Sequence, residues 1–91
     1  MAAESGFLHT NGARLYYEVA GSGHPLLLIH AGVADHRMWD DQVPAFAERY
    51  HTIRYDARGF GQSATVDVPF TNQQDALDLL DHLVVRQAHV I

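Results

Sequence analysis

An unbroken apolar run at residues 26–29, Leu-Leu-Leu-Ile, restricts the fold more than any other feature of the chain. It comes after a break at residues 21–25 that contains glycine and proline, and it leads into the turn His-Ala-Gly at residues 30–32. A continuously apolar strand is typical of a parallel sheet that is covered on both faces. The run therefore predicts a strand in the interior of an α/β sheet.

Strand and helix patterns alternate around this run. Asn11 and Gly12 lie between two strand-like segments and favour a β-hairpin, because both residues tolerate positive φ. The expected elements are strands at residues 7–10, 14–19, 26–29, 52–55 and 88–91 and helices at residues 38–49 and 72–84. This order, a hairpin followed by β-α-β-α-β, predicts an α/β fold with a mostly parallel, incomplete sheet.

The two helical segments have different signals. In the first, Pro44 marks either the first turn of a helix or a division into two short turns, and Met38 and Trp39 are expected to pack into the core. In the second, Thr71 and Gln74 have the spacing of a capping box. Its apolar residues form one stripe, and its aspartates form a solvated polar face: Asp75, Asp78 and Asp81.

Length and charge exclude several classes of function. The chain has 91 residues, 11 acidic and 6 basic side chains, a net charge of −5 and no cysteine. Such a surface repels phosphate backbones, so we expect no nucleic-acid binding. No apolar run is long enough to cross a membrane, and the first residues do not resemble a signal peptide. We expect a cytoplasmic protein whose residues 1–91 form a single partial domain.

The turn after the apolar strand is the first candidate site. Main-chain N–H groups in a tight turn at the carboxyl end of a strand can stabilise a developing oxyanion. The alternative is a plain strand-to-helix turn with His30 tucked beneath it, because a His-Ala-Gly sequence alone is short.

The loop at residues 56–63 is the second candidate. Asp56 ends a strand and fits a general base, a metal ligand or, as we prefer, an organiser of the loop. Arg58 is expected to pair with Asp56 or with loop carbonyls, while Gly59 and Gly61 permit positive φ. Ser63 is not a nucleophile, since the Gly-x-Ser-x-Gly pattern lacks its second glycine and no helix comes after it.

The histidines have no spacing that suggests a metal site. His24, His36, His51 and His89 lack a paired motif such as His-Glu-x-x-His, so we expect them at the surface or in loops.

Taken in order, these segments resemble the N-terminal part of the α/β-hydrolase superfamily, and most closely its enol-lactonase and carboxylesterase branch. The resemblance rests on residues 26–32, on Arg37 to Trp39, on residues 55–63 and on the Asp-Leu-Leu-Asp-His-Leu segment at residues 78–83. It implies that the N–H of Gly32 donates to the oxyanion and that Val33 contacts substrate. Ala31 stands where the family usually has glycine, and Val84 where relatives often have a glycine that ends the helix.

The resemblance also implies that the catalytic groups lie beyond residue 91. The nucleophile elbow of the family would begin at or just after Ile91, so the nucleophile, the triad acid and the triad histidine would all lie downstream. We therefore expect the N-terminal segment of a hydrolase for an ester, lactone or similar small acyl substrate, with no cofactor and no metal. This segment would be inactive alone. The alternative is a non-catalytic module that completes its sheet by pairing with another chain, including self-association through an open sheet edge.

Overall fold

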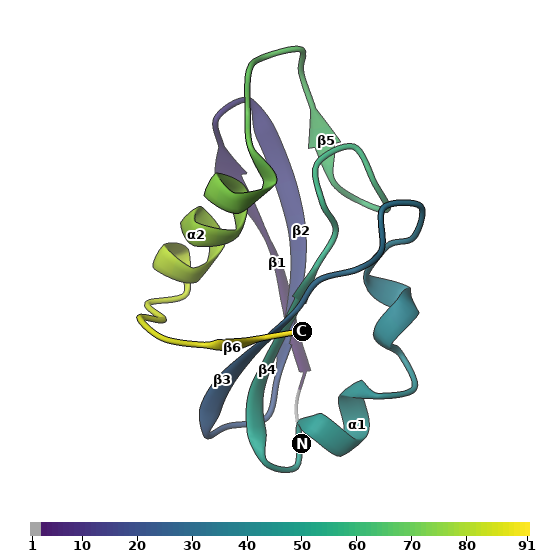
Figure 1. Cartoon of the computed structure of the whole chain (residues 1–91), viewed down its shortest axis with the longest axis vertical. Helices are drawn as coiled ribbons and strands as arrows, with labels where there is room; N and C mark the ends of the chain where they lie inside the picture. The colour runs from purple at the N-terminus through teal and green to yellow at the C-terminus, as the bar shows by residue number, and fades with distance from the viewer. Residues whose placement is uncertain (1–2) are drawn as a thin grey trace.

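The computed structural model describes residues 3–91, in which one mixed sheet has helices on both faces (Figure 1). The elements are β1 (Ala3–Thr10), β2 (Ala13–Ala20), β3 (His24–Leu28), the 3-10 helix η1 (His36–Trp39), α1 (Val43–Phe46), β4 (Tyr50–Tyr55), β5 (Ala64–Thr65), α2 (Asn72–His82) and β6 (His89–Val90). None of the helices within residues 3–91 is long and apolar enough to cross a membrane.

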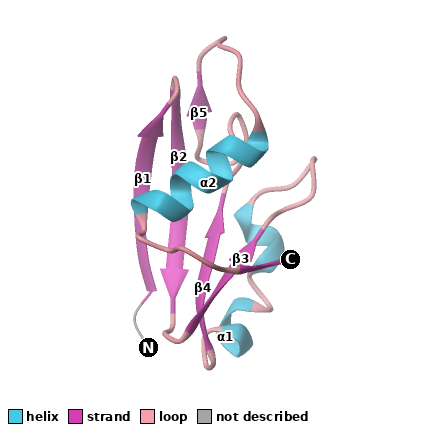
Figure 2. Ribbon diagram, turned by 60° about the vertical axis from the view of Figure 1, so that its left-hand side comes forward, coloured by secondary structure: helices cyan, strands magenta, loops and turns pink. Residues whose placement is uncertain are grey.

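The sheet has the strand order β1-β2-β4-β3-β6, with the short β5 paired to β2 (Figure 2). Strands β4, β3 and β6 are parallel, whereas β1, β2 and β5 contribute antiparallel pairs. The predicted α/β fold is confirmed, but the sheet is mixed: three strand pairings are antiparallel, and among the described strands only β3 with β4 and β3 with β6 are parallel.

The hairpin forms as predicted, and the apolar run lies in β3, which spans His24–Leu28 and leaves Ile29 outside the strand and 41% exposed. Asn11 and Gly12 both have positive φ, 42° and 78°, so the two-residue turn matches the twist of the flanking strands. In β3, Leu26, Leu27 and Leu28 are at most 3% exposed. Leu27 packs with residues of β4 and α2, while η1 and α1 lie on the opposite face of the sheet (Figure 1). Both faces of β3 are therefore covered.

The segment at residues 38–49 is divided into two short turns, the second of the two arrangements that Pro44 allowed. η1 ends before α1 begins, and Pro44 lies in the first turn of α1. The expectation that Met38 packs into the core is wrong, because its side chain is 46% exposed; its Sδ accepts a hydrogen bond from the N–H of Ala31 at 3.3 Å. Helix α1 is too short to cover more of the sheet.

The predicted N-cap of α2 is present, but the Gln74 side chain does not complete the capping box. The Thr71 hydroxyl accepts from the N–H of Gln74 at 3.0 Å. The Gln74 side chain donates to Asp78 at 2.8 Å instead of turning back to the cap. The placement of Asp75 on a solvated face is wrong, since this residue is only 2% exposed.

The C-terminal end of α2 has the hydrogen bonds of a Schellman motif. The N–H of Val84 donates to the carbonyl of Asp81, and the N–H of Val85 donates to the carbonyl of Leu80, at 3.0 and 2.8 Å. This motif requires a left-handed residue, usually glycine, and Val84 occupies it with φ of 58°. The helix thus ends sharply on a β-branched residue in an unfavourable backbone conformation.

Replacing Val84 by glycine is expected to raise the free energy of unfolding by about 1 kcal/mol. A left-handed conformation costs an L-residue roughly 1–2 kcal/mol, and the greater entropy of unfolded glycine offsets part of that gain. The side chain is 82% exposed, so little buried surface is lost. Urea unfolding should show a higher midpoint at unchanged slope. Val84→Ala, which keeps a Cβ, is the control and should gain less stability. If neither variant is more stable than the parent, the backbone of Val84 is not strained.

Candidate functional site

The carboxyl ends of β3 and β4 carry the two loops that the sequence singled out, and His30 joins them. This side chain is buried, with 8% exposure. Its Nδ1 lies 2.7 Å from the carbonyl oxygen of Ala31, and its Nε2 accepts from the N–H of Ala57 at 2.9 Å. The two contacts together require a proton on Nδ1 and a free electron pair on Nε2. His30 therefore fixes the turn after β3 against the loop after β4.

The turn beyond His30 leaves main-chain donors open. Ala34 donates back to the carbonyl of Ala31 at 3.0 Å, whereas within residues 3–91 neither Gly32 nor Val33 donates to a backbone carbonyl. Both residues are exposed, and the Val33 side chain has 97% of its surface free. Gly32 is not in the left-handed region, and a Cβ built on it would meet no atom within 4 Å.

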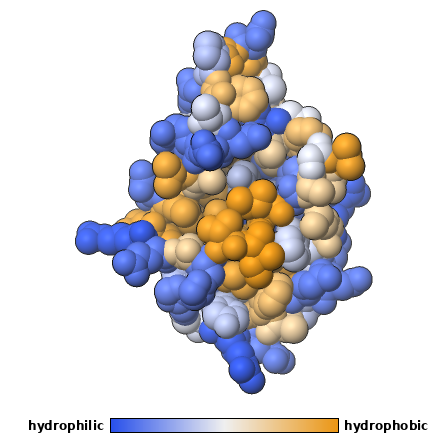
Figure 3. All heavy atoms as spheres, viewed as in Figure 1, coloured by the Kyte–Doolittle hydropathy of each residue, from blue (hydrophilic) through white to orange (hydrophobic). Residues whose placement is uncertain are grey.

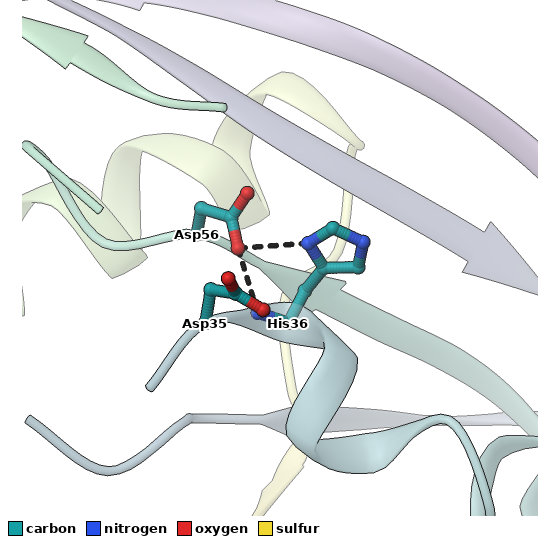
Figure 4. A group of neighbouring side chains, drawn as sticks. All are labelled: Asp35, His36 and Asp56. Atoms are coloured by element: carbon teal, nitrogen blue, oxygen red, sulfur yellow. Dashed lines mark hydrogen bonds and ion pairs between the residues drawn. The ribbon is translucent and has the colours of Figure 1, made fainter. Parts of the chain in front are cut away.

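Asp56 lies at the centre of the second loop with no exposed surface. Its Oδ1 accepts from the N–H of His36 at 2.6 Å and from Nδ1 of the same residue at 2.8 Å (Figure 4). Its Oδ2 accepts from the N–H of Gln62 at 2.8 Å. A carboxylate this deeply buried is tolerated only when its lone pairs are satisfied in this way. Asp56 consequently holds the start of η1 beside the end of its own loop.

His36 is a site residue that sequence reasoning missed. The expectation that it lies at the surface or in a loop is wrong, because it is the first residue of η1, is 7% exposed and is bonded to Asp56. On its other side Nε2 lies 3.4 Å from Glu18, which pairs with Arg54 at 2.7 Å. Glu18 and Arg54 face each other in the register of β2 and β4. No spacing in the sequence indicates the role of His36, since its partners Glu18 and Asp56 are 18 and 20 residues away in the chain.

Tyr16 closes this network on the side of β2. Its ring centroid lies 5.0 Å from that of His36, and its hydroxyl donates to Glu18. Burial raises the pKa of the Tyr16 hydroxyl, and the adjacent Glu18 carboxylate, which accepts a hydrogen bond from it, raises it further.

Arg58 forms a buried ion pair with a partner that was not predicted. Its Nε and Nη2 donate to the two carboxylate oxygens of Asp75 at 2.9 and 2.7 Å, and Nη1 donates to the carbonyl of Asn11 at 2.9 Å. The guanidinium carbon also lies 4.3 Å from the ring centroid of Phe70. Neither of the expected partners, Asp56 or the carbonyls of its own loop, is among these contacts, and the one carbonyl that Arg58 reaches belongs to the hairpin turn. Arg58 instead joins the loop to α2 and to the tip of the hairpin.

Ser63 uses its hydroxyl for structure. The Oγ donates to the carbonyl of Asp56 at 2.7 Å and accepts from the N–H of Tyr16 at 2.8 Å. The side chain is 8% exposed, and its proton is committed to an amide oxygen that is a poor base. This environment does not activate a nucleophile.

Asp35, His36 and Asp56 form the one cluster of three potential metal ligands within residues 3–91, with ligand atoms within 4.8 Å of one another (Figure 4). The side chains are already paired, however. Nδ1 of His36 donates to Asp56, so its proton occupies the direction that a cation would need. Arg37 binds the Asp35 carboxylate at 2.7–3.2 Å and holds its pKa well below the usual range. The geometry is that of a hydrogen-bonded loop anchor.

Two glycines provide a test of which loop is packed and which is open. A Cβ on Gly61 would overlap the Asp56 carboxylate, and its φ is 51°, whereas Gly32 has open space. We expect Gly61→Ala to destabilise the protein by more than about 2 kcal/mol, since it combines backbone strain with displacement of a buried carboxylate. Gly32→Ala should change stability by less than about 0.5 kcal/mol. Thermal and urea unfolding measure both; equal losses would contradict the close packing at Gly61 and the open space at Gly32.

Comparison with known proteins identifies relatives for most of this chain. A family model described as "Alpha/beta hydrolase family" matches residues 26–91. Soluble epoxide hydrolase from Corynebacterium sp. (strain C12) is 37% identical over 84 residues, which is 89% of this chain and 29% of that protein. 3-Oxoadipate enol-lactonase 1 from Acinetobacter baylyi is 40% identical over 57 residues, 60% of this chain and 21% of the lactonase.

A solved structure supports the same relationship. The crystal structure of a hydrolase from Pseudomonas aeruginosa PA01 superposes with a TM-score of 0.82 and 40% identity, covering 94% of this chain and 35% of that one. The chain thus spans between about a fifth and about a third of the length of these three relatives.

Proposed function

Since this chain belongs to the alpha/beta hydrolase family, we propose that it is the N-terminal part of a hydrolase for an ester, a lactone or a similar acyl substrate. The triad of serine, histidine and aspartate would come from polypeptide beyond residue 91. Relatives are about three to five times as long as the matched segment, which leaves room for these groups. Within this proposal, the chain provides the scaffold and part of the oxyanion hole.

The observation that carries the proposal is the turn after β3. His30 fixes its base, and the N–H groups of Gly32 and Val33 are not used in the backbone turns or strand ladders of the described residues. Donors that are fixed in advance and aimed at a developing negative charge stabilise it strongly. Gly32 would donate one hydrogen bond to the tetrahedral oxyanion, and Val33 would contact the substrate beside it.

An epoxide is the competing substrate class, because one relative is a soluble epoxide hydrolase. Epoxide opening also places negative charge on an oxygen atom, so the same N–H donors would serve either chemistry. The similarity to an enol-lactonase supports the acyl substrate that we propose.

The proposal is tested in a chimera in which residues 1–91 replace the matched segment of the Pseudomonas aeruginosa PA01 hydrolase. Gly32→Pro removes the N–H and should lower kcat by about 10²–10³-fold, the usual loss for one oxyanion donor. Gly32→Ala keeps the N–H and is the matched control, expected within a few-fold of the parent. Residues 1–91 alone should show no saturable turnover of a nitrophenyl ester. A folded Gly32→Pro chimera with normal kcat would refute the assignment.

A second candidate function is favoured by the exposed edge of the sheet. Ile29, Val90 and Ile91 are 41–57% exposed, and an apolar patch lies near the centre of Figure 3, where β6 ends in Figure 1. An unpaired strand edge next to apolar surface is a template for another chain. The non-catalytic alternative is a module that completes its sheet in this way, for which a second copy is one partner.

Sedimentation equilibrium measures this association. If β6 mediates it, Val90→Lys should weaken the self-association constant of residues 1–91 at least tenfold, because it places a charge on the pairing edge. Leu77→Lys on α2 is the matched control, since Leu77 is 55% and Val90 57% exposed. A monomer at every concentration, or equal effects of both lysines, would eliminate the edge as an interface.

A further inference from the structure

Two histidines that are far apart in the sequence meet at the start of β3 and β6. The ring centroids of His24 and His89 are 4.6 Å apart, with the planes inclined at 47°. Strands β3 and β6 lie side by side (Figure 1), and Leu26 is the register partner of His89. Because side chains alternate along a strand, His24 lies on the same face as Leu26 and therefore on the same face as His89. The pairing is thus a consequence of the sheet register.

The environment of this pair differs from that of the buried histidines. His30 and His36 use their ring nitrogens in hydrogen bonds to the loops that they anchor. His24 and His89 are both exposed, and each stands at the first residue of its strand. Two strand backbones hold the rings together, so a ligand that binds both does not have to order a loop first.

From this geometry we propose that His24 and His89 form a two-imidazole site for a divalent transition metal of the Cu²⁺ and Zn²⁺ type, with water in the remaining positions. Neutral imidazole is a preferred ligand of these ions. Two nitrogens bound at about 2.0–2.1 Å to one tetrahedral ion lie roughly 3.3 Å apart. The ring centroids of His24 and His89 are 4.6 Å apart, so one ion would bind both imidazoles after rotation of the side chains, with the strand backbones in place.

Binding at this site would act on the terminal strand. β6 is two residues long and is held by β3 through the pairs of Leu26 with His89 and Leu27 with Val90. A metal bound to one residue of each strand cross-links them in the folded state only, so it stabilises the fold by mass action. The site lies at the amino ends of the strands, opposite the turn that contains Gly32, and is independent of the proposed hydrolase chemistry.

The test is a titration of the tag-free chain with Zn²⁺ and, separately, with Cu²⁺ in competition with a chelator. We expect one ion per chain, tighter binding of Cu²⁺ than of Zn²⁺ and no binding of Mg²⁺, which prefers oxygen ligands. His24→Gln and His89→Gln should each weaken binding at least tenfold. His9→Gln is the matched control, because His9 is also an exposed strand histidine; this variant should bind as the parent does.

A second measurement separates loss of binding from loss of folding. The thermal midpoint of the parent and of His9→Gln should rise with Zn²⁺, whereas the midpoint of His89→Gln should not move although its metal-free melt stays cooperative. Equal affinity in the parent and in both pair variants would overturn the site. The site would also be overturned if His9→Gln weakened metal binding as much as His24→Gln does. The same holds if the number of ions bound per chain did not fall when His89 is replaced.

Discussion

A carboxylate without exposed surface, Asp56, determines where the loops at the carboxyl ends of β3 and β4 can lie. Burying such a group is costly unless its oxygens are satisfied, so the chain must bring donors to it. It does so with the N–H and Nδ1 of His36 and the N–H of Gln62. These hydrogen bonds fix the segment that begins η1 and the end of the loop after β4 to the same carboxylate.

The second buried carboxylate extends the same constraint to α2. Asp75 binds Arg58 through both oxygens, and Arg58 also reaches the carbonyl of Asn11. One side chain thereby connects the loop, the helix and the hairpin. With His30 linking the turn after β3 to Ala57, side-chain hydrogen bonds hold both loops of this edge, and the N–H groups of Gly32 and Val33 stay exposed on the turn that His30 fixes. Those donors are the part of the edge that is open to a ligand, in agreement with the hydrolase role proposed.

The local signals in the sequence predicted the longer strands and the hairpin turn but not the short strand β5. The apolar run at residues 26–29 identified β3, Asn11 and Gly12 identified the hairpin, and Thr71 identified the start of α2. These features depend on neighbours in the sequence or on the burial of one element. They can therefore be recognised within a short stretch of sequence.

Features that depend on tertiary partners were not predicted. Asp75 has the spacing of a solvated helix face, but it is buried because it forms an ion pair with Arg58 of the loop. His36 has no motif, because its carboxylate partners lie on β2 and after β4. The contact of His24 with His89 likewise arises from the register of β3 and β6. Helix α1 begins later than the apolar pattern suggests, since Pro44 in its first turn lacks the N–H that would continue the helix back toward η1.

Amide hydrogen exchange of the folded chain tests most directly whether buried side chains fix these loops. The N–H groups of His36, Ala57 and Gln62 lie outside the sheet, but each donates to a buried acceptor on Asp56 or His30. They should therefore exchange as slowly as the N–H of Ile53 in the centre of β4. Exchange of these three amides at the rate of exposed loop residues, while Ile53 stays protected, would contradict the account.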